Sequence, residues 1–180
     1  MLDRRFAGVL PWLYAPVDEA DDEATLVLRP FVGTLSVSYV VEQGDSTRAL
    51  ALAELAGGTT AQALHERALA NLVDHVEATG IRLSGHGSIM AVTFDGDMEA
   101  SLMLYPPLWA RLQDEMGDQL AVAVPARDVL AVAPLDSAAG LSELGSVIER
   151  VWPRDDHPLS SDIFVMSDGA WSVFAGPFPP

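Results

Sequence analysis

Alternating apolar and polar residues predict two strands in the first third of the chain. Over residues 34–42 the apolar side chains of Leu35, Val37 and Tyr39 occupy every second position, and a shorter alternation covers residues 25–29. A period of two places these side chains on one face of a strand, where they are buried together. We therefore expect strands over 25–29 and 34–42.

Helical spacing dominates the segment that follows. From Leu64 onward apolar residues recur three or four positions apart, Thr59 stands three residues before Gln62 in the order of a capping box, and Gly80 follows the last apolar position. This pattern predicts a helix over residues 60–79.

The rest of the chain alternates short apolar runs with turn residues. Asp95-Gly96 separates two apolar segments and is typical of a hairpin turn, so we expect a hairpin of residues 88–94 and 99–105. The same reasoning predicts a helix that begins at Pro106 and ends before Gly117, strands over 119–124 and 129–134, a helix over 141–152, and a hairpin of 163–166 with 170–174.

Hairpins mixed with isolated helices, without a regular alternation of strand and helix, favour an α+β fold. We expect a mainly antiparallel sheet packed with two to three helices in a single domain over residues 25–175. An acidic N-terminal extension over residues 1–24 is expected to precede it.

Composition limits the chemistry that this chain can perform. The 180 residues are 49% hydrophobic and include no cysteine, and all 10 basic residues are arginine. These values fit a compact fold and exclude disulfides, cysteine-zinc sites, thiol catalysis and lysine Schiff bases. No apolar stretch reaches the length of a membrane-spanning helix, and Pro11 and Pro16 interrupt the one segment that resembles a secretion signal. We therefore expect a cytoplasmic bacterial protein that does not bind membranes.

The charge of the chain indicates what kind of partner it meets. The formal net charge is −16, with acidic residues concentrated over 18–23 and again over 155–168. Such a surface repels nucleic acid and speeds the encounter with cationic surfaces. We therefore expect a basic protein partner and no nucleic acid, whereas the oligomeric state does not follow from the sequence.

Three carboxylates near the Asp95-Gly96 turn are the candidate metal ligands. Asp95, Asp97 and Glu99 are spaced by two, so in a strand they would share one face and offer oxygen ligands to a divalent cation. The remainder of a calcium loop is missing, and a polar hairpin turn is the simpler interpretation. We expect no metal ion or other cofactor.

Arg127-Asp128 stands between two strands that are expected to be buried. A guanidinium in this place is suited to bidentate bonds with a carboxylate, either that of Glu99 or the acid group of a ligand. The first alternative predicts that Arg127→Ala lowers stability, and the second predicts a folded variant that has lost binding. The histidines add no metal motif, since His65 and His75 would lie ~15 Å apart along the predicted helix.

Three short motifs resemble those of a known bacterial family. In order along the chain they are Ala70-Asn71-Leu72, Gly96-Asp97-Met98-Glu99-Ala100-Ser101 and Pro125-Ala126-Arg127-Asp128. Their order and spacing are similar to those of the YtpQ-like proteins, a bacterial family of unknown function, over residues 29–152, although Asp97 stands where that family typically has asparagine. The resemblance implies no activity, but it groups Asn71, Glu99, Arg127 and Asp128 as one polar cluster.

The acidic composition, without a recognisable catalytic constellation, favours a non-catalytic module that binds a basic protein as an adaptor or an immunity-like inhibitor. The alternative is a small-molecule or metal-dependent enzyme that gathers Asp97, Glu99, Arg127 and Asp128 in one cleft. The sequence leaves the choice open and favours the non-enzymatic function.

Overall fold

Two antiparallel sheets and three α-helices make up the computed structural model over the residues that it describes, 6–15, 26–43, 46–55 and 59–175. The first sheet has the order β1-β3-β2, with β4 also paired to β3, and its strands are β1 (Leu10–Tyr14), β2 (Arg29–Val32), β3 (Leu35–Gln43) and β4 (Ser46–Ala49). The second sheet has the order β10-β9-β7-β8-β6-β5, with strands β5 (Arg82–His86), β6 (Ile89–Thr93), β7 (Leu120–Ala123), β8 (Leu130–Pro134), β9 (Ile163–Ser167) and β10 (Ala170–Val173). The helices are α1 (Ala61–Thr79), α2 (Pro106–Met116) and α3 (Ala138–Val151), with the 3₁₀ helices η3 (Leu52–Leu55) and η4 (Glu99–Leu104).

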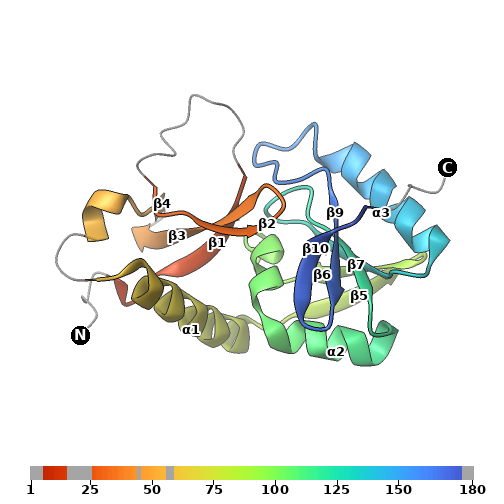
Figure 1. Cartoon of the computed structure of the whole chain (residues 1–180), viewed down its shortest axis with the longest axis horizontal. Helices are drawn as coiled ribbons and strands as arrows, with labels where there is room; N and C mark the ends of the chain where they lie inside the picture. The colour runs from red at the N-terminus through yellow and green to blue at the C-terminus, as the bar shows by residue number, and fades with distance from the viewer. Residues whose placement is uncertain (1–5, 16–25, 44–45, 56–58, 176–180) are drawn as a thin grey trace.

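The architecture confirms the predicted α+β class, since every pairing between these strands is antiparallel. Figure 1 shows the first sheet and α1 on one side of the molecule and the second sheet with α3 on the other. The expected helix from Pro106, the central strand pair and the C-terminal hairpin are confirmed as α2, β7 with β8, and β9 with β10. Helix α3 begins earlier than expected, because Ser137 Oγ accepts the N–H of Gly140 and caps it.

The central strands β7 and β8 are buried on both faces, which explains their continuous apolar runs. Their larger side chains, such as Val122 and Val132, face the main core, whereas alanines alternate with them on the side of α3. Small side chains let α3 approach the sheet closely, and a Cβ added at Gly140 would lie only 2.7 Å from the Cβ of Ala133. This packing gives the turns at both ends of β7 and β8 a rigid support.

Helix α1 matches the predicted helix over 60–79, but its cap differs from the expectation. The N-cap is Thr60 rather than Thr59, and its Oγ1 accepts the N–H of Ala63 at 3.1 Å. The apolar stripe that the spacing indicated is buried, with Leu64 and Leu72 at 0% and 1% exposure.

The predicted hairpin of residues 88–94 and 99–105 is wrong in its second half. Ile89–Thr93 forms β6, but the following segment forms η4, and β6 pairs with β5 and β8 instead. Asp95 and Glu99 accept hydrogen bonds from four main-chain N–H groups between residues 94 and 98, which turns the chain away from a strand. Residues 99–103 are all buried, so no polar face in the sequence reveals the helical turn.

The expected division into an extension over 1–24 and a domain over 25–175 does not match the first sheet. Strand β1 pairs with β3, and Leu13 within it is 3% exposed, so this part of the expected extension belongs to the folded domain. The strand expected over 25–29 is displaced to β2, at Arg29–Val32. The acidic run over 18–23 lies outside the described residues.

Candidate functional site: two polar hollows at opposite ends of the central strands

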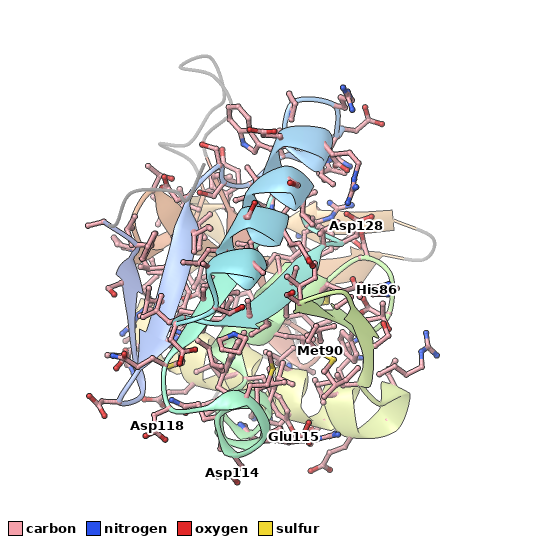
Figure 2. The ribbon with its side chains drawn as sticks, turned by 90° about the vertical axis from the view of Figure 1, so that its right-hand side faces the viewer. His86, Met90, Asp114, Glu115, Asp118 and Asp128 are labelled. Atoms are coloured by element: carbon pink, nitrogen blue, oxygen red, sulfur yellow. The ribbon has the colours of Figure 1, made fainter. Side chains whose placement is uncertain are left out.

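Strand register brings two sets of turns to opposite ends of the second sheet. Leu120 at the start of β7 lies opposite Pro134 of β8 and Met166 of β9. The start of β7 therefore meets the ends of β8 and β9, whereas the loop over 124–129 lies at the other end of the same strands. Figure 2 accordingly shows Asp118 at the lower edge of the molecule and Asp128 well above it.

A hollow of about 350 Å³ at the upper end, here called the Arg127 end, is lined by charges of both signs. Arg127 Nη2 lies 2.6 Å from Asp97 Oδ1, and the Arg127 guanidinium carbon lies 4.3 Å from the centre of the Trp12 ring. The hollow is also lined by Asp128, Arg154, Asp155, Asp156 and His157. Arg127 borders a second hollow of about 490 Å³ beside Trp12, so its side chain, which is 23% exposed, does not face a closed core.

The expected partnership between Arg127 and Glu99 is not formed. Glu99 is 2% exposed, and its Oε1 accepts the N–H groups of Phe94 and Gly96 at 2.9 and 2.8 Å, while its Oε2 has no hydrogen-bond partner among the residues that the structure describes. The carboxylate thus holds the turn before η4. Arg127 instead contributes its main-chain oxygen to this region, where it accepts the N–H of Ala100 at 3.0 Å.

Asn71 also stands apart from the expected polar cluster. Its Nδ2 donates to the carbonyl oxygens of Ala7 and Val9, at 2.9 and 2.7 Å. These bonds tie α1 to the segment that leads into β1. Of the four residues that the resemblance groups, Arg127 and Asp128 line the hollow at the Arg127 end, whereas Asn71 and Glu99 are not part of its lining.

The three candidate metal ligands are each engaged by the protein itself. Asp95 Oδ1 accepts the N–H groups of Asp97 and Met98, and its Oδ2 lies 2.9 Å from His75 Nε2. Asp97 pairs with Arg127, and Glu99 holds the turn described above. Within the described ranges, no three metal-ligating side chains are arranged to hold an ion.

The hollow at the lower end, here called the acidic end, measures about 410 Å³ and is lined by Asp118, Asp136 and Asp168. These residues belong to three different turns, which precede β7, follow β8 and join β9 to β10. No arginine or histidine lines this hollow, and in the described part of the chain none of the three carboxylates has an ion-pair partner. Figure 2 places Asp114, at the end of α2, at the same lower edge as Asp118.

Short polar bonds fix the turns of the acidic end to one another. Gln119 Nε2 donates to Ser167 Oγ at 3.2 Å, and the Gln119 carbonyl accepts the N–H of Leu135 at 3.0 Å. From α2, Gln113 Nε2 donates to the carbonyl of Asp118 at 2.6 Å. The three carboxylates are thus carried by turns that are bonded to each other and to α2.

Sequence reasoning missed the acidic end, because its residues are scattered from 118 to 168 and form no run. The acidic concentration that we noted over 155–168 is divided in space, with Asp155 and Asp156 at the Arg127 end and Asp168 at the acidic end. Only the pairing of β7 with β8 and β9 brings Asp118, Asp136 and Asp168 together.

Comparison with protein-family models, with curated proteins and with solved structures finds no match to this chain. The resemblance to the YtpQ-like proteins therefore stays a prediction. Among the helices of the described residues, none combines the length and the apolar character needed to cross a membrane.

Proposed function

We propose that this protein is a non-catalytic module that binds a basic segment of a partner protein, and that the acidic end is where the partner docks. The observation that carries this proposal is the hollow lined by Asp118, Asp136 and Asp168 without a positive side chain in its lining. An adaptor and an immunity-like inhibitor both fit this function. The cysteine-free composition supports a cytoplasmic setting.

Electrostatics explains why a cationic side chain would be favoured there. Carboxylates gathered around one hollow repel each other, and in the described structure no cation offsets this repulsion. An arginine or lysine that enters the hollow exchanges repulsion for attraction, and an arginine can bond two of the carboxylates at once. Because the supporting turns are bonded together, little conformational entropy is lost on binding.

The Arg127 end gives less support to the enzymatic alternative. That alternative needs an arginine and two carboxylates directed at one point, but the Arg127 guanidinium is paired with Asp97 and lies over Trp12. Glu99, the second carboxylate expected there, is directed at main-chain N–H groups. We therefore retain the binding module as the proposed function.

The test uses a cationic peptide and two variants that remove the same number of charges. Binding of fluorescein-labelled nona-arginine is measured by anisotropy for the wild type and for the triple variant Asp118→Asn, Asp136→Asn, Asp168→Asn. The control variant is Asp74→Asn, Glu77→Gln, Glu149→Gln, which neutralises exposed carboxylates on α1 and α3.

We expect the acidic-end variant to bind at least tenfold more weakly than the wild type and the control variant to lose less than threefold. Wild-type affinity should also fall as salt rises, because screening weakens exposed ion pairs. Equal losses in the two triple variants would mean that net charge alone attracts the peptide, and the proposal would be rejected. Absence of binding by the wild type at low salt would reject it as well.

A further inference from the structure

A further hollow is larger than the three described above and adjoins the acidic end at the β9–β10 turn. It measures about 590 Å³ and is lined mainly by residues of β2, α1, α2 and the β9–β10 hairpin. Figure 1 shows these four elements around the middle of the molecule, where the two sheets approach each other. This volume lies within the range of about 300–1,000 Å³ that is typical of small-molecule sites.

Aromatic side chains from three elements form the wall of this hollow. Trp109 and Trp171 meet edge to face, with ring centres 4.7 Å apart, and Phe31 meets Trp171 at 6.2 Å. Trp109 is 2% exposed, and its Nε1 donates to the carbonyl of Leu102 at 2.9 Å. The polar atom of this ring is therefore already bonded, and the ring forms the floor behind the more exposed Phe31 and Trp171.

Three polar side chains interrupt the apolar wall. Gln113 is already bonded to the carbonyl of Asp118, and the first of the other two is Arg29. Arg29 Nη1 donates to Gln62 Oε1 at 2.8 Å, and in the described ranges no carboxylate lies within 4.0 Å of its guanidinium. The positive charge is thus available at the hollow without an internal counter-ion.

The second polar side chain is His65, whose hydrogen bond determines what it offers to a ligand. His65 Nδ1 lies 3.0 Å from the hydroxyl of Tyr39, a residue that is 1% exposed. Burial raises the pKa of the Tyr39 hydroxyl, so it remains protonated. Burial, and then the charge of Arg29, lower the pKa of His65, so its ring is neutral at pH 7.

The protonated Tyr39 hydroxyl and the neutral His65 ring together determine which ring nitrogen of His65 carries the proton. The Tyr39 O–H donates to Nδ1 of His65, because no other acceptor for it is found among the described residues. The imidazole proton then resides on Nε2 of His65, which has no hydrogen-bond partner in the described part of the chain. His65 therefore presents an N–H donor beside the hollow, in addition to the N–H donors of Arg29.

We propose that this hollow binds a small aromatic carboxylic acid, with its carboxylate held by Arg29 and His65 Nε2 and its ring packed against Phe31 and Trp171. An oxyanion suits two donors of which one carries an uncompensated charge. An aromatic ring suits a wall in which two indoles already meet edge to face. The two hollows share no lining residue, but they adjoin at the β9–β10 turn, where Gly169 lines this hollow and Asp168 lines the acidic end.

The net charge of −16 repels an anion at long range, so the attraction between the anion and the donors of Arg29 and His65 has to exceed this repulsion. At about 0.15 M salt the screening length is about 8 Å, and charges farther than this from the carboxylate contribute little. Binding should therefore be measured at physiological ionic strength.

The experiment compares an acid with a neutral compound of the same shape. Binding of 1-naphthaleneacetate and of 1-naphthaleneacetamide is measured by isothermal titration calorimetry for the wild type, for Arg29→Gln and for Arg82→Gln. Arg82 is the matched control, because it is an exposed arginine on β5 outside the lining of the hollow. Both substitutions remove one surface charge, and a thermal melt verifies that each variant is folded.

We expect saturable binding with one site, in which the wild type binds the acid at least tenfold more tightly than the amide. Arg29→Gln should weaken binding of the acid about tenfold, or ~1.4 kcal/mol, and leave binding of the amide unchanged, whereas Arg82→Gln should change neither. A Trp171→Leu variant should weaken binding of both compounds. No saturable binding at millimolar acid, equal affinity for acid and amide, or equal effects of the two arginine substitutions would overturn the proposal.

Discussion

Substitution of Arg127 by alanine is expected to lower the free energy of unfolding without unfolding the protein. The residue makes two identifiable side-chain interactions, an ion pair with Asp97 at 2.6 Å and a cation–π contact with Trp12 at 4.3 Å. The ion pair is partly solvated, since the side chains are 23% and 47% exposed, so its contribution is about 0.5–1 kcal/mol. The cation–π contact adds about 0.5–2 kcal/mol.

The expected loss for Arg127→Ala is therefore about 1–3 kcal/mol. At about 2–4 °C per kcal/mol for a chain of this length, the melting temperature should fall by about 2–12 °C. Urea unfolding followed by circular dichroism measures the loss, and a double-mutant cycle with Asp97→Asn isolates the ion pair, with an expected coupling of about 0.5–1 kcal/mol.

Arg154→Ala is the matched control, because Arg154 lines the same hollow but is exposed, and among the described residues its side chain bonds only to the carbonyl of Arg150. We expect this control to change the free energy of unfolding by less than about 0.5 kcal/mol. If Arg127→Ala costs no more than Arg154→Ala, or if the cycle shows no coupling with Asp97, the stabilising role of Arg127 is refuted.

Three further predictions concern other parts of the fold. Gly140→Ala should destabilise by about 1–2 kcal/mol in urea unfolding, because the new Cβ lies 2.7 Å from Ala133 Cβ and this overpacking exceeds the gain in helix propensity; a more stable variant would contradict this. Glu99→Ala should cost about 2–5 kcal/mol because two main-chain N–H groups lose their acceptor, whereas Glu99→Gln keeps an acceptor oxygen and should cost less; equal costs would argue against this role. In the folded state the pKa of His65 is lowered from its ordinary 6.5, so on acidification the unfolded chain takes up the proton first and stability falls as the pH drops below 6.5. The free energy of unfolding measured between about pH 7.5 and 5 should therefore depend less on pH in His65→Gln than in the wild type. Identical pH profiles of the two proteins would refute this.

The sequence could identify some candidate site residues but not the residues that they contact in the structure. A charge between two apolar strands stands out in the sequence, which makes Arg127 a candidate. The structure places Arg127 at a hollow, as the alternative of a ligand-binding arginine requires. Its partner in the structure, Asp97, is neither Glu99 nor the acid group of a ligand, the two alternatives that the sequence suggested, because residues 99–104 form the 3₁₀ helix η4 in place of the expected strand. Asn71 was singled out by the resemblance, but its hydrogen bonds to Ala7 and Val9 depend on the packing of β1.

Local patterns by themselves determined several elements of this protein. The helix over 60–79 and the strand pair of β7 and β8 follow from side-chain periodicity, caps and turn residues, all of which act between residues close in sequence. The edge strand β5 escaped prediction because it is short, polar and mostly exposed, so burial imposes no alternation on its sequence.

Tertiary structure alone decided which residues line each of the four hollows. The acidic end joins turns separated by up to 50 positions, from Asp118 to Asp168. The hydrogen bond between Tyr39 and His65 joins a strand to a helix. Each set exists because strand register and helix packing bring distant segments together. A chain's local preferences contain no information on such register until the whole core is formed, since burial of apolar surface across many residues selects it.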